Sequence, residues 1–449
     1  MKKRLLVTTA LVSAALIAAV GSAQKKWSLS EAAAPYKGTK LTLATVAWTD
    51  AVKNISAEFS KQTGIAVEVV QIPGAQILEK TLLELRNKGT AYDLFTATFK
   101  RPYTKAGVAQ PLRGFLTNAN LADPEWNRSD FVRASNFFQD PDKGSNIVSI
   151  PFGASGMGMF YRKDLFADPK HQTAYKTKYR RDLTAPRTWA DFERVAEYFH
   201  TADWKSFGGA KGVGVSLAAT RAGDPLMWHF ALLSAGAALE KGKSINSLLD
   251  TKNALTFEPY SLSALERLQR ISKFAQSSYL QTDDTAAREL FLGGGAAMVI
   301  TWDSFLGRLG TGEIANKWSL AATPSRTLLG GWSLMLNPSS KNQSAAFLLA
   351  QYLSSQENDM KMFELAGRYP ARASSYKSAT YKAKNPYGEI LADSKERGMF
   401  QVDSQVSGQF NATISEGVSQ MLAGQLEPKA AADKLSTNLN RVLEDAGLK

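Results

Sequence analysis

The sequence has no cysteine among its 449 residues, and its only histidines are His171, His200 and His229. The absence of cysteine excludes disulfide bonds, cysteine nucleophiles, thiolate zinc sites and iron–sulfur clusters. So few histidines also argue against a His-rich metal site. Walker, dinucleotide-binding and zincin motifs are missing as well. We therefore expect neither a metal nor a cofactor.

Acidic residues are in deficit, because 54 Lys+Arg face 41 Asp+Glu and leave a formal net charge of +13. This excess leaves open an acidic partner, such as nucleic acid or a membrane surface. The composition is nevertheless that of a folded chain, with 44% hydrophobic and 10% aromatic residues. The length allows two or three domains with large cores.

Long apolar runs are confined to the N-terminus. The basic segment 1–4 precedes an apolar run from Leu5 to Val20, and small residues follow at 21–23. This layout predicts a secretory signal peptide at 1–23 and a periplasmic or extracellular protein. No later run approaches the length of a membrane span. No cysteine follows the predicted cleavage site, so we expect no lipid anchor attached through cysteine.

Strand and helix patterns alternate in the first part of the predicted mature chain. Residues 40–46 and 66–70 read as strands, and a third strand begins at Asp93. Between them lie two helical patterns, which end at Gly64 and Gly89. This order predicts a parallel sheet covered by helices, with ligands bound beyond the carboxyl ends of its strands.

The middle of the chain predicts a second unit of the same α/β class. A helix is expected to begin at Trp189 with Thr188 as its N-cap, and residues 293–300 read as a tight turn into a buried strand. Trp189 itself is expected to be structural. The basic stretch from Lys170 to Arg181, which contains Tyr175 and Tyr179, is interpreted as an exposed loop, so these tyrosines are not expected to bind a ligand.

Several segments together resemble one protein family. They are Phe59 to Val69, Tyr92 to Phe95, Ala106 to Leu112, Ile150 to Phe152 with Phe160 to Phe166, Pro186 to Phe192, Phe291 to Trp302, Gly330 to Trp332, Ser340 to Asn342, and Tyr369 to Arg372. In this order they resemble the extracytoplasmic solute-binding proteins of ABC importers, specifically the carbohydrate-type class that includes maltose-binding protein. The resemblance covers nearly the whole predicted mature chain.

The resemblance implies an α/β, two-lobed periplasmic-binding-protein fold, in which each lobe is a mainly parallel sheet flanked by helices. The expected N-terminal lobe holds residues 24–152 and 323–354, and the C-terminal lobe holds 153–322 and 355–449. A sugar or oligosaccharide would bind in the cleft between the lobes, be enclosed by hinge closure, and pass to a membrane permease. The resemblance implies no catalysis and no nucleic acid, and we expect a monomer.

Cleft positions are carried over from the family by alignment of these segments. They are Trp48, Thr49, Asp50, Thr96, Thr98, Ser155, Asp224, Met227, Trp228, Trp302, Asp303, Gly331, Trp332, Arg368, Arg372 and Asn411. Aromatic rings suit the apolar faces of a sugar, and polar side chains suit its hydroxyl groups. Trp302 is the strongest candidate for stacking. Asp50 and Asp303 could instead cap helices, Arg368 and Arg372 could be surface cations, and Lys100 and Arg101 are expected to be solvated.

Three other functions stay open from the residues alone. A secreted carbohydrate-active enzyme would need a pair of essential carboxylates, whose spatial pairing a sequence does not reveal. The segment Gly153-Ala154-Ser155-Gly156 begins like a serine-hydrolase turn, but Met157 stands where that turn needs glycine. A solute-binding protein for a non-sugar solute is the second alternative. A nucleic-acid or adhesion protein would show clustered cations among exposed aromatics, which only the stretch 170–181 approaches.

Overall fold

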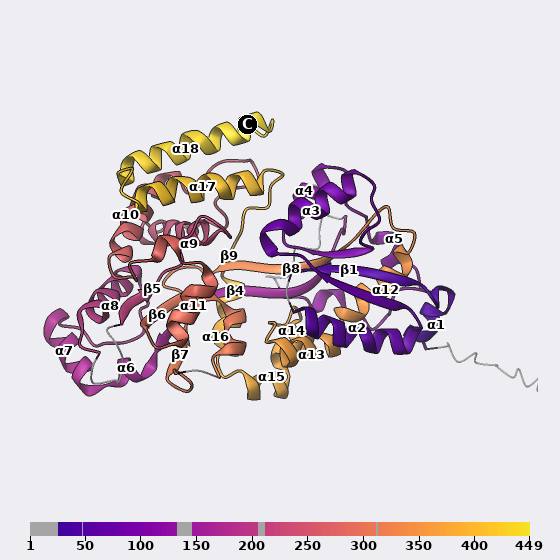
Figure 1. The fold of residues 1–449 in the computed structure, drawn as a ribbon, viewed down its shortest axis with the longest axis horizontal. Helices are drawn as coiled ribbons and strands as arrows, with labels where there is room; N and C mark the ends of the chain where they lie inside the picture. The colour runs from indigo at the N-terminus through magenta and orange to yellow at the C-terminus, as the bar shows by residue number, and fades with distance from the viewer. Residues whose placement is uncertain (1–25, 47, 133–145, 205–211, 311–312) are drawn as a thin grey trace, which may run out of the picture.

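The computed structural model describes residues 26–46, 48–132, 146–204, 212–310 and 313–449. The predicted signal at 1–23 lies outside the described residues. The chain forms two bodies side by side, and two long strands run from one into the other (Figure 1). The described strands make one sheet in the order β2-β1-β3-β8-β4-β6-β5, with β7 paired to β4 and β9 paired to β8. This arrangement confirms the predicted two-lobed α/β fold. The second lobe differs from the expected mainly parallel sheet, because strand β4 pairs antiparallel with β6 and β7, and among the described strands of this lobe only β5 and β6 pair in parallel.

The first lobe contains the predicted alternation of strands and helices. Strand β1 pairs in parallel with both β2 and β3. Helix α2 ends at Gly64, whose positive φ of 72° lets the chain turn into β2. The elements of this lobe are α1 (Leu29–Ala33), β1 (Lys40–Thr45), α2 (Thr49–Thr63), β2 (Ala66–Gln71), α3 (Gly74–Arg86), β3 (Leu94–Ala97), α4 (Arg101–Lys105), α5 (Arg113–Leu116) and α12 (Gln343–Leu353).

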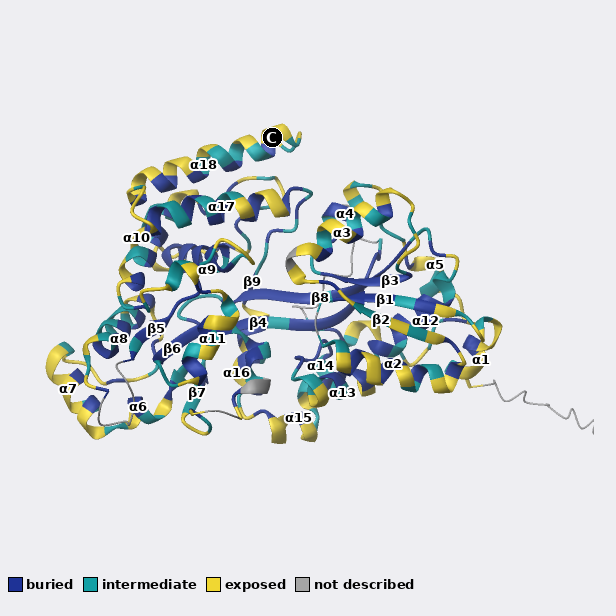
Figure 2. Ribbon diagram, viewed as in Figure 1, coloured by how far each residue is buried: buried dark blue, intermediate teal, exposed yellow. Residues whose placement is uncertain are grey.

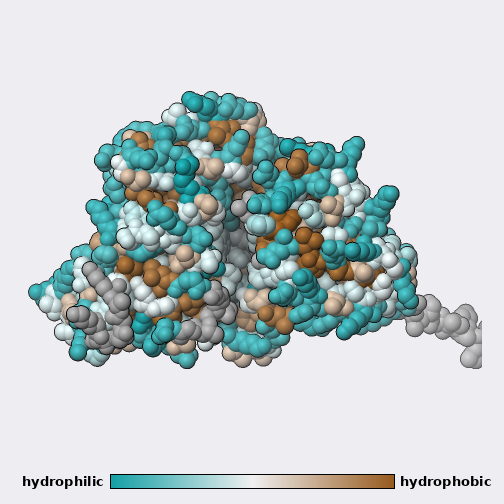
Figure 3. All heavy atoms as spheres, viewed as in Figure 1, coloured by the Kyte–Doolittle hydropathy of each residue, from teal (hydrophilic) through white to brown (hydrophobic). Residues whose placement is uncertain are grey.

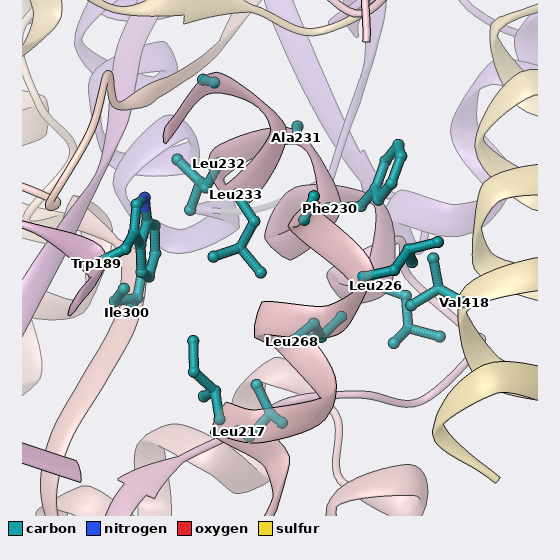
Figure 4. Packing of buried hydrophobic residues seen from close by; sticks show 14 of the residues in the cluster. Trp189, Leu217, Leu226, Phe230, Ala231, Leu232, Leu233, Leu268, Ile300 and Val418 are labelled. Carbon is teal, nitrogen blue, oxygen red and sulfur yellow. The ribbon is translucent and has the colours of Figure 1, made fainter. Parts of the chain in front are cut away.

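The second lobe has a large core of its own. Figure 4 shows part of it, with Leu226 beside Val418 and Trp189 beside Ile300. Trp189 is 3% exposed, in agreement with its predicted structural role. The elements are α6 (Lys163–Ala167), α7 (Pro169–Tyr179), α8 (Trp189–Thr201), β5 (Val213–Ser216), α9 (Pro225–Glu240), α10 (Ser261–Ser272), α11 (Asp284–Leu292), β6 (Ala296–Trp302), η7 (Asp303–Arg308), β7 (Trp318–Ala321), α17 (Ser407–Leu422) and α18 (Pro428–Asp445).

The interpretation of the stretch 170–181 as a loop was wrong, because most of it forms helix α7. The Asp168 side chain accepts hydrogen bonds from the amides of Lys170 and His171, and Pro169 occupies the first turn. Tyr175 is 2% exposed and packs into the second lobe, while the cations lie mainly on the outer side. A capped helix with buried positions therefore explains this stretch.

The two lobes share strands β4 (Ile150–Arg162) and β8 (Leu328–Leu336), which we call the hinge strands. They pair antiparallel over Ile150 to Gly156. Beyond this region β8 pairs with β3 in the first lobe, and β4 pairs with β6 and β7 in the second. Figure 2 shows both hinge strands as almost wholly buried. A change in the angle between the lobes must therefore bend these two strands.

A further segment connects the lobes beside the hinge strands. It contains α13 (Gln356–Ala366), α14 (Ala373–Lys377), α15 (Ala379–Lys384), α16 (Gly388–Glu396) and β9 (Met399–Phe400). Helix α13 packs against α2 of the first lobe, whereas α16 packs against β4. The predicted lobe boundaries fall inside β4, between β7 and β8, and between α12 and α13, and they stay a prediction.

Replacement of Gly331 by alanine should destabilise the hinge strands. Gly331 has a φ of 148°, and an added Cβ would lie 2.4 Å from the Gly153 carbonyl oxygen. Strained backbone of this kind costs about 1–3 kcal/mol per residue, so the urea midpoint should fall clearly. The control is Gly114→Ala on α5, where an added Cβ meets nothing within 4 Å. Equal midpoints for the two variants would contradict the assignment.

Candidate functional site

The first lobe presents polar and aromatic groups at the carboxyl ends of its parallel strands. Trp48 follows β1 in a left-handed conformation, with a φ of 56°, and its ring makes an edge contact with Phe152 at 6.5 Å. Thr49 donates a hydrogen bond of 3.1 Å from Oγ1 to Oε1 of Gln71, which ends β2. Asp50 is exposed in the first turn of α2. The predicted group Trp48, Thr49 and Asp50 therefore lies at the strand ends.

The hinge strands are open to solvent at few positions. Along β8 only Trp332 is half-buried, and along β4 only Ser155 and Tyr161 are. Ser155 pairs in register with Gly330, and Trp332 pairs with Gly153. The space-filling view shows the molecule hollowed between its two halves (Figure 3). Two predicted site residues, Ser155 and Trp332, are thus among the three half-buried positions of these strands.

Two indoles from the second lobe meet beside the hinge strands. The rings of Trp228 and Trp302 are half-buried and form an edge contact, with centroids 5.3 Å apart and planes at 84°. The Trp302 ring covers Gly330, where an added Cβ would lie 2.8 Å from Cζ3. The amide nitrogen of Gln401 comes close to the same glycine. Sequence analysis missed Gln401, because the strand before it has only two residues, too few to show an alternation of apolar and polar side chains.

A polar pair from α9 and α17 lies on the second lobe. Asn411 donates a hydrogen bond of 3.1 Å from Nδ2 to Oδ2 of Asp224. Asn411 is 3% exposed, and its Oδ1 has no hydrogen-bond partner among the described residues. Burial raises the pKa of Asp224, and the bond from Asn411 opposes that shift. The pair therefore retains a buried acceptor that is ready for an additional donor.

Other predicted residues are less accessible. Thr96 is fully buried, and its hydroxyl has no hydrogen-bond partner among the described residues. Thr98 is half-buried, and its carbonyl accepts a bond of 2.5 Å from Nζ of Lys100. Met227 is 1% exposed and belongs to the second-lobe core, so its side chain lies away from the hollow. Gly331 supplies backbone that the pairing of the hinge strands requires.

Asp303, predicted as a ligand or a helix cap, instead forms a buried ion pair. Its Oδ2 lies 2.7 Å from Nζ of Lys395 and accepts a hydrogen bond of 3.1 Å from the Gly156 amide. Burial raises the pKa of Asp303, and the Lys395 ammonium opposes that shift. Lys395 also lies 4.0 Å from the centre of the Tyr369 ring. This pair connects α16 and η7 to the middle of β4 at Gly156.

Arg368 and Arg372 are not surface cations, because both are buried. Arg368 is 1% exposed, donates from Nη2 to Oδ1 of Asp359 at 2.9 Å, and lies over the Phe152 ring. Arg372 donates from Nε to the Ser354 carbonyl at 2.7 Å. Both arginines therefore secure the chain next to the hinge strands. A sequence pattern could not identify such a role, because it depends on which carboxylates are near in space.

Lys100 was predicted to be solvated and is 1% exposed. Burial lowers its pKa to about 7, and the Asp403 carboxylate opposes that shift. The prediction failed because Asp403 lies 303 residues further along the chain and covers this position. Lys100 thus belongs to a contact between the lobes.

A cavity of about 700 Å³ lies apart from the predicted residues. Its lining includes Trp318 and Tyr387, whose ring centroids are 5.0 Å apart, together with Phe363 and Lys163. None of the predicted site residues lines it. Within the described residues, no group of His, Asp and Glu is arranged to hold a metal ion, and none of the helices has the length and apolar character needed to cross a membrane.

Comparison with known proteins gives a consistent family and fold. The model of the family described as bacterial extracellular solute-binding protein matches residues 54–387. A relative from Sinorhizobium fredii, named a probable amino-acid ABC transporter periplasmic-binding protein, is 24% identical over 357 residues, which is 76% of this chain and 74% of the relative.

Solved structures share the fold at low sequence identity. The maltose-bound MalE3 of T. maritima has a TM-score of 0.74 and 19% identity, over 90% of this chain and 100% of that chain. A solute-binding protein of an ABC transporter from Agrobacterium radiobacter, in complex with ribitol, has a TM-score of 0.74 and 21% identity, over 90% and 99% of the two chains.

Loss of the Asp303–Lys395 pair should destabilise the protein strongly. Lys395→Met would leave the Asp303 carboxylate buried without its cation, and breaking one partner of such a pair costs about 3–5 kcal/mol. The control is Lys429→Met, because Lys429 pairs with Asp433 on the exposed surface of α18 and such pairs contribute about 0–1 kcal/mol. Urea unfolding measures both effects. A similar small loss in the two variants would refute the buried-pair interpretation.

Proposed function

This chain belongs to the bacterial extracellular solute-binding protein family, and we propose that it is the importer subunit that captures a sugar or oligosaccharide between its lobes. It is a binding protein and not an enzyme, and it works outside the cytoplasm. The proposed handover is to the membrane permease of an ABC transporter. We propose further that it acts as a monomer, without nucleic acid and without a lipid anchor attached through cysteine.

The observation that carries the proposal is the Trp228–Trp302 pair beside the accessible part of the hinge strands. A pyranose has apolar C–H faces that stack on indole rings and a rim of hydroxyl groups that need hydrogen-bond partners. Asp224 and Asn411 supply acceptors on the second lobe, and Asn411 keeps one buried oxygen without a partner. An arrangement of rings and buried acceptors favours a polyhydroxylated solute over a charged one.

The proposed binding residues are distributed over both lobes. They are Trp48, Thr49, Asp50, Thr96, Thr98, Ser155, Asp224, Trp228, Trp302, Trp332 and Asn411, with Gln71 and Gln401 as additions from the structure. A solute that contacts both groups would gain contacts as the lobes close, so binding would favour the closed arrangement. The hinge strands would accommodate this motion. The proposed N-terminal lobe holds residues 24–152 and 323–354, and the proposed C-terminal lobe holds residues 153–322 and 355–449.

The comparisons motivate both the proposal and its main alternative. Of the similar proteins, one solved structure holds maltose and another holds ribitol, which favours sugars and polyols for this chain. The relative named for amino acids keeps a non-sugar solute as the second candidate. A secreted carbohydrate-active enzyme would convert a glycan into products.

Titration with mono- and oligosaccharides, followed by tryptophan fluorescence and calorimetry, tests the proposed function. We expect stoichiometric binding without product formation, because the site offers stacking and hydrogen bonds. Turnover of a glycan would contradict the proposal, and binding of amino acids in place of sugars would select the second candidate.

Trp302→Ala should weaken sugar binding by about tenfold or more, because a stacked aromatic contributes roughly 1 kcal/mol beyond the area it buries. The matched control is Trp318→Ala, which removes a half-buried indole from the separate 700 Å³ cavity. Thermal melts verify that both variants fold. Loss of binding in the Trp318 variant alone would transfer the site to that cavity.

A further inference from the structure

One carboxylate of the second lobe is bound by backbone amides of the first. Asp403 accepts from the Lys100 amide at 3.1 Å to Oδ1 and 3.3 Å to Oδ2, and from the Arg101 amide at 3.0 Å. The two sides are separated by more than 300 residues of sequence. The contact is therefore tertiary and not a local turn.

Both sides of this contact are held by the cores of their own lobes. Lys100 lies between Ala97 and Tyr103, which are 2% and 1% exposed and belong to one first-lobe cluster. Asp403 lies between Val402 and Val406, which are 2% and 7% exposed and belong to the second-lobe core. Figure 1 shows the segment between β9 and α17 along the side of the second lobe that faces the first. Neither side can follow the other through a large rotation of the lobes.

We propose that Asp403 is an interlobe latch, whose hydrogen bonds to the Lys100 and Arg101 amides stabilise the closed arrangement and are released when the lobes open. The inference rests on the proposed function, because a latch matters for a protein that opens to admit a solute. Hydrogen bonds to an ionised acceptor are the strong ones in proteins. The latch therefore adds to closure without contacting the solute.

The latch is connected to the solute site through Lys100. Its ammonium group donates to the carbonyl of Thr98, a proposed binding residue at the end of β3. The titratable and charged groups at this contact are Lys100, Arg101 and Asp403. Burial raises the pKa of Asp403, and Lys100, Arg101 and the two backbone amides oppose that shift. Closure therefore brings the Asp403 carboxylate to the amides of Lys100 and Arg101, which lie two and three residues after the proposed binding residue Thr98.

The latch sets the apparent affinity through the closed fraction. When only the closed arrangement binds tightly, the apparent dissociation constant rises as the population of that arrangement falls. Asp403→Asn keeps the shape of the side chain and removes its charge. We expect a lower closed fraction and a sugar dissociation constant raised by about tenfold, mainly through faster release.

The absence of cysteine makes the test direct. Lys80→Cys on α3 and Thr437→Cys on α18, both exposed positions, carry spin labels for distance measurement by pulsed electron paramagnetic resonance. In ligand-free protein, Asp403→Asn should shift the population toward longer distances than in the labelled parent. Saturating sugar should restore the same short distance in both. The control Asp433→Asn removes an exposed carboxylate on α18 and should change neither distances nor affinity.

The outcomes separate the latch from the proposed function. The ligand-free distances test the latch even when no sugar binds. If no sugar binds the protein but Asp403→Asn changes the ligand-free distance distribution, only the proposed function is contradicted. Identical distributions in Asp403→Asn and the parent overturn the latch. If the variant fails to fold, hydrogen exchange in the unmodified protein decides. Lys100 and Arg101 amides must exchange at least about tenfold more slowly than in the urea-unfolded chain, and exchange at the unfolded rate overturns the latch.

Discussion

The pairing of β4 with β8 is the constraint on which the rest of the molecule depends, because each strand belongs to both lobes. Two glycines of β4 leave room for buried cationic side chains to pack directly against this strand. An added Cβ would lie 3.3 Å from Nη1 of Arg368 at Gly153 and 3.2 Å from Cγ of Lys395 at Gly156. Each cation is buried only because a carboxylate, Asp359 or Asp303, neutralises it in place. Buried ion pairs therefore support the hinge strands at both Gly153 and Gly156.

This support also determines where a solute can bind. With the α13–α16 segment packed beside β4, Ser155 and Trp332 are half-buried positions where the two hinge strands pair, and a ligand can reach them there. The Trp302 ring of the Trp228–Trp302 pair covers Gly330, the register partner of Ser155, and Trp48 at the end of β1 contacts Phe152 of β4. A site composed of groups from two movable bodies discriminates well, because an incomplete ligand leaves buried polar groups without partners.

Sequence reasoning succeeded where the structure is local. Alternation of apolar residues and the glycine at position 64 predicted β1, α2 and β2, and Thr188 caps α8 as expected. It failed where a role depends on which groups meet in the folded chain. Lys395, the partner of Asp303, follows much later in the sequence, and Asp359 lies only nine residues before Arg368 but no pattern indicates that the two side chains pair. The many cations of 170–181 led to the prediction of an exposed loop. The stretch is instead mostly helix, because Asp168 caps its start and Tyr175 is buried. The resemblance predicted half-buried aromatic residues such as Trp228 and Trp302 at the edge of the hinge strands, whereas Asp303 and Arg368 are buried in ion pairs.

The central claim is that the lobes close around a solute by rotation about β4 and β8. Small-angle X-ray scattering of the mature protein, with and without a saturating amount of the sugar that binds it, tests this claim most directly. We predict a smaller radius of gyration in the complex, because closure brings the outer ends of the lobes together. An unchanged radius of gyration under conditions where calorimetry shows full occupancy would contradict the account.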